Sequence, residues 1–217
     1  MEIVYLGHSA FKIKGKEATV VTDPYDKYIG FLMMKTEAQV VTISHEHKDH
    51  NCLERVTGEP FVVRGPGEYE IKGISIFGIP TYHDGEEGEK RGKNTIYVIE
   101  VDGIRICHLG DLGHKLSDAV LEEVNGVDVL LVPVGGVFTI GPKTATSVVG
   151  QIQPSIVVPM HYKTPKHNKE SFGKVAEVDK FLKEIGFEDA KKLDKLKIQG
   201  KEQISEEMEV IVLNFKG

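Results

Sequence analysis

The sequence has few cysteines and no excess of positive charge. Its 217 residues include only Cys52 and Cys107, too few for a disulfide scaffold or for a zinc site built from cysteine alone. We expect both thiols to be small, buried apolar side chains. The chain has 27 Lys and Arg against 33 Asp and Glu, which gives a net charge of -6. Because nucleic-acid phosphates are bound by cations, this balance predicts no nucleic-acid partner.

The sequence also lacks a segment long enough to cross a membrane. Its longest apolar run, residues 129–141, is interrupted by Pro133, Gly135 and Gly136 and falls short of the roughly 20 residues that span a bilayer. The opening residues MEIVYLGHSAFKIKG alternate like a strand and show no cationic start, apolar core and cleavage site of a signal peptide. We therefore expect a cytoplasmic protein that does not insert into membranes.

The distribution of apolar residues predicts one domain over residues 1–217, with no low-complexity linker. Short apolar runs between Gly-rich turns predict mainly strands in the first half, and strands alternate with helices in the second. Ser117 is a typical helix N-cap, Pro142 suits a first helical turn, and residues 175–185 form an amphipathic helix that ends at Gly186. The predicted strands are 2–6, 10–14, 18–22, 38–44, 60–64, 74–79, 95–101, 104–108, 128–133, 155–159 and 209–215.

The strongest chemical signal is a histidine cluster in the run HEHKDH, which contains His45, His47, Asp49 and His50. Such a combination arises by chance in roughly one chain in a thousand, which disfavours a plain polar loop. His45 and His47 are two residues apart, so an extended backbone projects both to one side. On one tetrahedral ion, some of four ligands so close in the sequence would be redundant or strained, so they suit two adjacent ions that distant residues complete. Imidazoles with carboxylates suit zinc, iron or manganese, whereas Lys48 is expected to face away as a solvated cation.

These residues carry a family resemblance. HEHKDH after an apolar strand resembles the HxHxDH signature of the metallo-β-lactamase superfamily. Further segments match in order: TDP at 22–24, a lone His83 ending a strand, LGD at 109–111 and VPMH at 158–161. LGHS at 6–9 and FTIGP at 138–142 narrow the resemblance to a metal-dependent hydrolase branch related to ascorbate-6-phosphate lactonase and N-acylphosphatidylethanolamine phospholipase D. The matches cover residues 4–162.

The resemblance implies an α+β fold, an αββα sandwich of two mixed β-sheets flanked by helices, with the site along one edge. It implies two divalent metal ions, zinc first and manganese or iron as alternatives. The implied ligands are His45, His47 and His83 for one ion, Asp49, His50 and His161 for the other, and Asp111 bridging both. His45, Asp111 and His161 each follow a predicted strand, where backbones turn and side chains converge, and this placement supports the implied set.

Other polar residues have weaker contexts. Asp23 either accepts a proton from a ligand imidazole or braces the loop at His45, or it is a plain turn aspartate before proline. His8 either orients substrate or shuttles protons, or it is structural; with Asp49, these two are the candidate catalytic residues. His108 rivals His83 as a ligand. His114 and His167 have no motif context and are expected at the surface.

The implied site predicts metal-assisted hydrolysis. Two divalent ions, two aspartates and a bridging hydroxide leave a charge of about +1, which favours an anionic or polarised small-molecule substrate. Metal ions lower the pKa of a bound water to about 7. The hydroxide would attack a carbonyl carbon or a phosphorus, aimed by Asp49, while the second ion stabilises the developing charge. We therefore predict a hydrolase of an ester, lactone or phosphodiester.

Two other functions stay open: a mononuclear iron oxygenase or redox member of the same fold, and a non-catalytic metal-binding member. The loops set the substrate. The apolar segment 26–35 is core, a pocket floor or the contact of a homo-oligomer, and the charged, Gly-rich segment 84–94 is an exposed mobile loop or lid. Leu112 and the run Gly135-Gly136-Val137 depart from the pattern of the relatives, so their substrate is not carried over.

Overall fold

Strands within residues 2–64, with one short strand from residues 196–197, form a six-stranded mixed sheet in a computed structural model that describes residues 1–215. Residues 216 and 217 of the predicted domain lie outside the described residues. The strand order is β15-β1-β2-β3-β5-β7; β1 to β3 pair antiparallel, and β3, β5 and β7 pair parallel. The strands are β1 (Glu2–Gly7), β2 (Ala10–Lys14), β3 (Thr19–Thr22), β5 (Val40–Ile43), β7 (Phe61–Arg64) and β15 (Leu196–Lys197), and a separate pair is formed by β4 (Thr36–Glu37) and β6 (Val56–Thr57).

The second sheet has eight strands in the order β14-β16-β13-β12-β11-β10-β9-β8. The strands β8 to β11 pair antiparallel, whereas β11, β12, β13, β16 and β14 pair parallel. Their bounds are β8 (Gly67–Ile71), β9 (Ile74–Tyr82), β10 (Lys93–Val101), β11 (Ile104–His108), β12 (Val129–Pro133), β13 (Ile156–Met160), β14 (Lys191–Leu193) and β16 (Glu209–Leu213). The buried parallel strands read as continuous apolar runs because both of their faces are covered.

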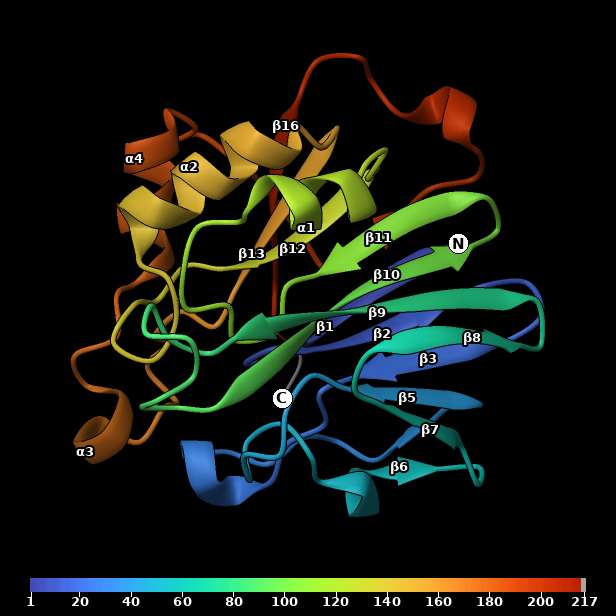
Figure 1. The fold of residues 1–217 in the computed structure, drawn as a ribbon, viewed down its shortest axis with the longest axis horizontal. Helices are drawn as coiled ribbons and strands as arrows, with labels where there is room; N and C mark the ends of the chain where they lie inside the picture. The colour runs from blue at the N-terminus through green and yellow to red at the C-terminus, as the bar shows by residue number, and fades with distance from the viewer. Residues whose placement is uncertain (216–217) are drawn as a thin grey trace.

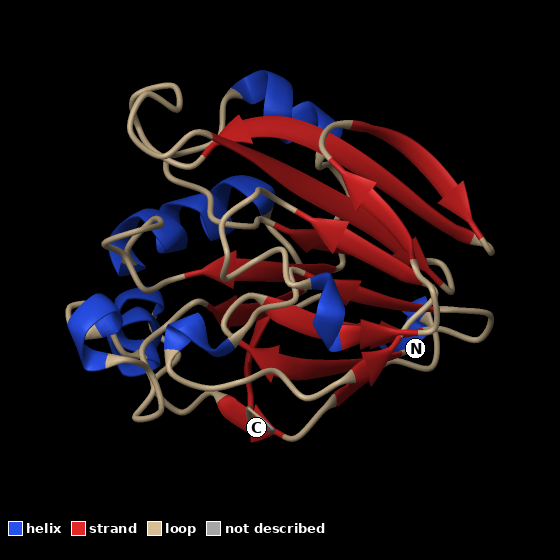
Figure 2. Cartoon of the chain, turned by 90° about the horizontal axis from the view of Figure 1, so that it is seen from below, coloured by secondary structure: helices blue, strands red, loops and turns tan. Residues whose placement is uncertain are grey.

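Helices flank the two sheets unequally. The helices α1 (Asp118–Glu123), α2 (Pro142–Ile152) and α4 (Val178–Ile185) lie above the sheets in Figure 1, whereas the opposite side carries the short helices η1 (Lys27–Ile29) and η2 (Leu53–Arg55). Figure 2 shows most of the helices to the left of the strands and at the top, whereas strands reach the right-hand edge. The remaining helices are α3 (Lys169–Phe172) and η3 (Lys201–Gln203). The expected αββα sandwich is therefore present, with one of its outer layers reduced to irregular chain.

The strand period of two divides the core between the sheet faces. On β1, Ile3 and Tyr5 face the large cluster between the two sheets, whereas Leu6 faces a second cluster on the outside. Ile29 and Met33, both fully buried, belong to that second cluster. The segment 26–35 thus contributes core residues, as one of its three interpretations predicted, although other apolar side chains of the segment remain exposed.

The helix signals in the sequence are confirmed at three positions. The Ser117 side chain accepts a hydrogen bond from the Val120 N–H at the start of α1. Pro142 occupies the first turn of α2. Gly186 ends α4 with a left-handed φ of 81°, a conformation that costs glycine little. The predicted helix 175–185 begins only at Val178, because residues 173–177 connect α3 to α4.

Several strands escaped the sequence analysis. The strand β8 is an edge strand with the sequence GEYEI, whose charged residues point to solvent and leave no apolar run to recognise. The strands β4, β6, β14 and β15 contain two or three residues each and are too short for periodicity to show. Cys107 is buried as expected, but Cys52 is only partly buried. Among residues 1–215, no helix has the length and apolar character needed to cross a membrane.

Candidate metal centre

Six of the candidate residues lie just beyond the C-terminal ends of strands. The strands β1, β3 and β5 share one direction in the first sheet, and β9, β11 and β13 share one direction in the second. The residues that follow these strands are His8, Asp23, His45, His83, Asp111 and His161. The ring centroids of His8 and His161, one from each sheet, are 4.2 Å apart. Strand ends of both sheets therefore meet at a single site.

The structure brings the first predicted ligand group together. His45, His47 and His83 offer ring nitrogens that all lie within 4.8 Å of one another. Their ring centroids are 4.6 Å apart for His45 and His47, and 4.7 Å for His45 and His83. The rival ligand, His108, is engaged elsewhere, because its Nε2 donates to the Ser9 carbonyl at 2.8 Å and its Nδ1 accepts from the backbone. His83, rather than His108, therefore faces the cluster.

The second predicted group is also assembled, and it includes one more histidine. Potential ligand atoms of His8, Asp49, His50 and His161 lie within 4.8 Å of one another. This group is more deeply buried than the first: His50 is 0% and His161 1% exposed, whereas His47 of the first group is exposed. The two groups thus form an open half and a buried half of the same site.

Asp111 lies between the two halves. Its Oδ2 is 3.3 Å from His83 Nε2 in the open half and 3.2 Å and 3.3 Å from the Nε2 atoms of His50 and His161 in the buried half. The same oxygen is 4.0 Å from His45 Nε2. One carboxylate therefore reaches the ring nitrogens of both groups, which is the position that a bridging ligand requires.

Several inward-facing polar atoms have no hydrogen-bond partner in the described part of the chain. They are His45 Nε2, His50 Nε2, Asp111 Oδ1 and both ring nitrogens of His161. Buried polar atoms are nearly always paired, and each unpaired one costs about 1–3 kcal/mol. A cation bound among imidazole nitrogens and carboxylate oxygens would supply the missing partner for several of them. The residues present therefore fit a metal site.

Burial keeps two of the histidines neutral. It lowers the pKa of His8 to about 3, with a further contribution from neighbouring His161. Burial likewise holds the pKa of His45 well below the usual range, assisted by His50. A metal ligand must be a neutral imidazole. His45 is therefore in its coordinating form over the whole neutral range of pH.

The carboxylates, in contrast, stay ionised despite their burial. Burial alone would raise the pKa of Asp111, but His161 and His50 hold it well below its usual value. His50 and His8 do the same for the pKa of Asp49. In turn, Asp111 and Asp49 outweigh burial and raise the pKa of His50. The site thus attracts positive charge to its centre, as a cation site must.

Asp23 contacts the buried half from behind. Its Oδ2 lies 3.0 Å from His50 Nδ1 and accepts a 2.5 Å hydrogen bond from the Ser44 hydroxyl. Its Oδ1 accepts from the Ser44 N–H at 2.8 Å, directly before His45. Although burial opposes it, the hydrogen bond to His50 keeps the pKa of Asp23 below its usual value. Asp23 therefore contacts both the His50 ring and the loop at His45, which is the geometry that the two functional alternatives require.

His8 contacts the same half from another side. Its Nε2 lies 3.2 Å from Asp49 Oδ2, and its backbone carbonyl accepts hydrogen bonds from the Tyr5 hydroxyl and the His161 N–H, both at 2.8 Å. His8, Asp23 and His161 have left-handed φ values of 56°, 39° and 52°, which residues other than glycine rarely adopt. The chain is therefore locally strained at three points of the site.

The expectation that His167 is a surface residue is wrong. The side chain is 7% exposed, and its ring centroid is 5.0 Å from that of Phe31 and 5.2 Å from that of Phe172. Its Nδ1 accepts hydrogen bonds from Thr164, and burial lowers its pKa to about 4. His114, by comparison, is partly exposed. Nothing in the sequence around His167 signalled this packing, which depends on the approach of distant chain.

The middle of the segment 84–94 is largely exposed as expected, but Asp84 and Asn94 at its ends are buried, and the segment has a defined internal structure. The Asp84 carboxylate accepts hydrogen bonds of 2.7–3.0 Å from the backbone N–H groups of Glu86, Gly88, Lys90 and Arg91. Against the effect of desolvation, these donors lower the pKa of Asp84 to about 2. The predicted mobile loop is thus organised around one carboxylate that immediately follows His83.

Two cavities border the centre. One, of about 390 Å³, is lined by Tyr28, His47, Lys48, Asp49, Arg91, Phe138 and Phe172. The other, of about 570 Å³, lies on the other side of His47, and its lining includes Arg64, Arg91 and Lys93. Lys48 is exposed as expected, but it borders the first cavity instead of facing away from the site. The sequence analysis did not name Arg91 or Phe172 as residues that border the site. The only sequence signals nearby were the charged loop 84–94, which contains Arg91, and the FTIGP motif, which begins at Phe138.

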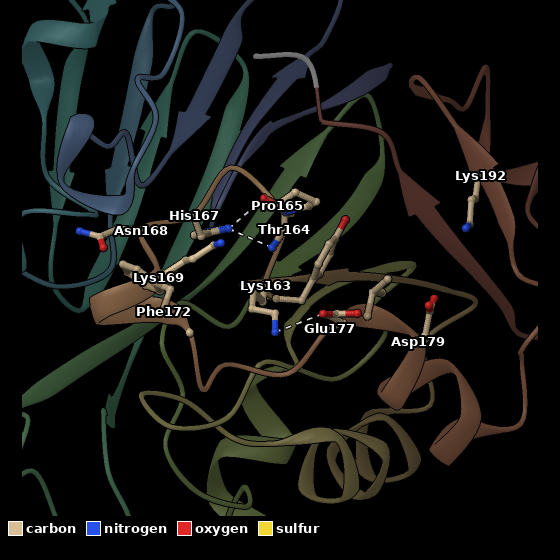
Figure 3. A pocket seen from close by; sticks show the side chains of 13 residues that line it. Lys163, Thr164, Pro165, His167, Asn168, Lys169, Phe172, Glu177, Asp179 and Lys192 are labelled. Atoms are coloured by element: carbon tan, nitrogen blue, oxygen red, sulfur yellow. Dashed lines mark hydrogen bonds and ion pairs between the residues drawn. The ribbon is translucent and has the colours of Figure 1, made fainter.

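A further pocket of about 540 Å³ lies behind Phe172. Figure 3 shows its walls, formed by residues 163–169, the start of α4 and Lys192. Lys163 is paired with Glu177 at 3.1 Å, and the Nδ1 of His167 is held by Thr164 (Figure 3). These polar groups are paired with one another, unlike the atoms that converge at the candidate centre.

Comparisons with known proteins agree with the geometry. A model of the β-lactamase superfamily domain matches residues 2–161. A UPF0173 metal-dependent hydrolase of Thermococcus onnurineus is 30% identical, over 82% of this chain and 95% of that protein, and one of Staphylothermus marinus is 31% identical over 81% and 90%. A candidate Zn-dependent hydrolase of the metallo-β-lactamase superfamily from Thermotoga maritima has a similar solved structure, with a TM-score of 0.82, 37% identity and 99% of each chain covered.

Proposed function

The chain belongs to the β-lactamase superfamily and is a metal-dependent hydrolase, and from this premise we propose that it cleaves an ester, lactone or phosphodiester at a pair of divalent ions. The observation that carries the proposal is Asp111, whose Oδ2 lies within 3.3 Å of ring nitrogens from both halves of the centre. One carboxylate placed between two groups of unpaired ligand atoms supports two ions better than one.

The ligand assignment follows the two halves. His45, His47 and His83 would hold the ion of the open half. Asp49, His50 and His161 would hold the ion of the buried half, with Asp111 shared between them. When bound, two such ions supply a water with a lowered pKa and a Lewis acid for the developing negative charge. The set of imidazoles and carboxylates suits zinc, with manganese or iron as alternatives.

Two residues outside this ligand set would position it. Asp23 fixes the ring of His50 through Nδ1, so the opposite nitrogen, Nε2, points to the centre. His8 holds Asp49 through Oδ2, which leaves the other carboxylate oxygen free to orient the attacking water. These contacts support Asp49, His8 and Asp23 as the residues that align the reaction.

The hydrophobic core and the cavities beside the site support further proposals on domain organisation and substrate. The larger hydrophobic cluster contains residues of both sheets, which favours one domain over the whole chain. Cavities of about 390 and 570 Å³ are the size of small-molecule sites. We propose a small, anionic substrate, no nucleic-acid partner and a cytoplasmic location. A homo-oligomer would give the exposed apolar side chains of segment 26–35 a contact surface.

Metal analysis of the purified protein by mass spectrometry tests the proposal. We expect about two zinc or manganese ions per chain. We also expect hydrolysis of at least one member of a panel of lactones, phosphodiesters and thioesters. Asp49→Ala should abolish that hydrolysis, whereas Asp189→Ala, which removes an exposed aspartate, should not. One iron per chain with oxygen uptake would replace the hydrolase proposal with an oxygenase, and no stoichiometric metal would contradict both.

A further inference from the structure

The cavity of about 390 Å³ beside the open half has two kinds of wall. Its base is His47 and Asp49 of the candidate centre, and the rest of its lining consists of aromatic side chains and cations. The aromatic residues are Tyr28, Phe138 and Phe172, and the cations are Lys48 and Arg91. The protein has a net charge of -6, so the two cations make this small aromatic pocket more positive than the molecule as a whole.

The aromatic wall is continuous and reaches the centre. The ring centroids of Tyr28 and Phe172 are 6.4 Å apart, and those of Phe172 and Phe138 are 5.5 Å apart. Phe138 and Phe172 each lie 6.4 Å from the ring of His161. A planar or apolar group bound along this wall would therefore lie next to the metal ligands. Tyr28 is 50% exposed, so the wall is open to a ligand at its outer end.

A positioned cation ends this wall. The Arg91 guanidinium lies over the Phe138 ring, 5.1 Å from its centroid, and donates to the Val137 carbonyl at 3.1 Å. The Arg91 backbone is fixed by the Asp84 carboxylate. Among residues 1–215, neither Arg91 nor Lys48 forms an ion pair with a carboxylate. A fixed guanidinium with unused donors is suited to an anion, because little side-chain freedom is lost on binding.

We propose that this cavity is the substrate subsite and that it selects molecules with an aromatic or similarly flat apolar group and a negative charge separate from the bond that is cleaved. Arg91 is the main anion-binding residue, Lys48 adds charge, and Tyr28, Phe138 and Phe172 bind the flat group. This inference rests on the proposed hydrolase function and assigns its substrate class. It places the scissile group over His47 and Asp49, at the base of the cavity.

A matched pair of inert probes tests the subsite without any turnover. Naphthalene-2-sulfonate carries the flat group and a permanent negative charge, and methyl 2-naphthyl sulfone has nearly the same shape and no charge. Isothermal titration calorimetry of the metal-loaded protein should show the sulfonate binding at least about tenfold more tightly than the sulfone. Methanesulfonate, which lacks the rings, should bind more weakly than the naphthalene anion.

Three variants locate the binding. Arg91→Met should weaken sulfonate binding about tenfold and leave sulfone binding within about twofold. Tyr28→Ala should weaken both probes to the same degree. Lys183→Met is the control, because Lys183 is an exposed cation on α4, away from both cavities beside the centre, and it should change neither probe by more than about twofold. Equal binding of the two probes, or an equal loss in Lys183→Met and Arg91→Met, would overturn the proposal.

The same samples separate this inference from the hydrolase function. The variant Asp111→Asn changes the candidate centre at a residue that does not line this cavity, so it should retain the sulfonate preference of the wild type while its hydrolysis is lost. If the wild type binds the probes as expected but contains no stoichiometric metal, the hydrolase mechanism fails and the subsite stands. If metal and hydrolysis are present but the sulfonate has no preference, the subsite fails and the mechanism stands.

Discussion

The two halves of the metal centre use the same ligand chemistry in very different surroundings. In the buried half, His50 and His161 are almost inaccessible, Asp23 holds the far nitrogen of His50, and His8 holds Asp49. In the open half, His47 is exposed and borders both neighbouring cavities. The buried half is therefore built into the hydrogen-bond network of the fold, and the open half is built for access. Ligands in the first should matter for stability as well as metal binding. In the second, His45 and His83 are buried as well, so His47 is the candidate ligand that should matter mainly for metal binding and turnover.

The largest expected effect compares one ligand from each half. His50→Ala leaves Asp23 and Asp111 as buried carboxylates without their shared imidazole, so we expect a loss of about 3–5 kcal/mol in the unfolding free energy. His47→Ala removes an exposed ring and should change the unfolding free energy by less than about 0.5 kcal/mol. Urea denaturation of both variants with a chelator present measures the difference. Similar stabilities for the two variants would show that the halves are not distinct.

The second effect concerns the support of the buried half. Asp23→Ala removes the acceptor behind His50, and we expect a loss of about 10–100-fold in the affinity for one metal ion. The ion of the open half should be weakened less, because Asp23 reaches its ligand His45 only through Ser44, so competition with a chromophoric chelator should show one site weakened more than the other. Thr42→Ala, a substitution of a nearby buried residue on β5, controls for a general disturbance of the core. Equal weakening of both sites would contradict the separation of the halves.

The smaller of the two expected effects on the unfolding free energy is a pH dependence that comes from His167, a buried residue outside the two ligand groups. Burial lowers the pKa of His167 to about 4 in the folded protein. Between about pH 6.5 and 4, the His167 imidazole is therefore protonated in the unfolded chain and neutral in the folded one. The unfolding free energy should therefore fall as the pH decreases through this window, with His167 contributing about 3 kcal/mol. His167→Gln should flatten the dependence in the metal-free protein, as measured by urea denaturation at several pH values. The same change at the partly exposed His114 is the control, and an unaltered slope in His167→Gln would refute the assignment.

Much of the candidate centre could be predicted because its residues follow strands in a local, readable way. HEHKDH after an apolar strand needs no tertiary information. The strand before His161 is a continuous apolar run, and the strand before Asp111, IRICH, is apolar apart from Arg105 and His108. Similar local logic placed the start of α1 at Ser117 and the end of α4 at Gly186. The superfamily and its sandwich fold, inferred from those motifs, are confirmed by the family match and the Thermotoga maritima structure.

The remainder depends on contacts between segments that are distant in sequence. His167 is buried because residues 163–168 pack against Phe31 and Phe172, and no spacing in the sequence encodes that approach. The segment 84–94 has the composition of a flexible loop, yet a single carboxylate, Asp84, organises it. Arg91 reaches the site only through this loop. Charge and composition locate such residues on the surface, but they do not show which cavity a side chain will border.

His8, Asp23 and His161 combine a left-handed backbone, which lowers the stability of the fold, with a polar side chain that faces the candidate centre. Each such conformation costs of order 1 kcal/mol or more for these residues and almost nothing for glycine. Selection for robustness alone would therefore favour glycine at the very positions where the imidazole or carboxylate is needed. A search for more stable variants of this enzyme should therefore expect the glycine substitutions at these positions to raise stability and to abolish activity.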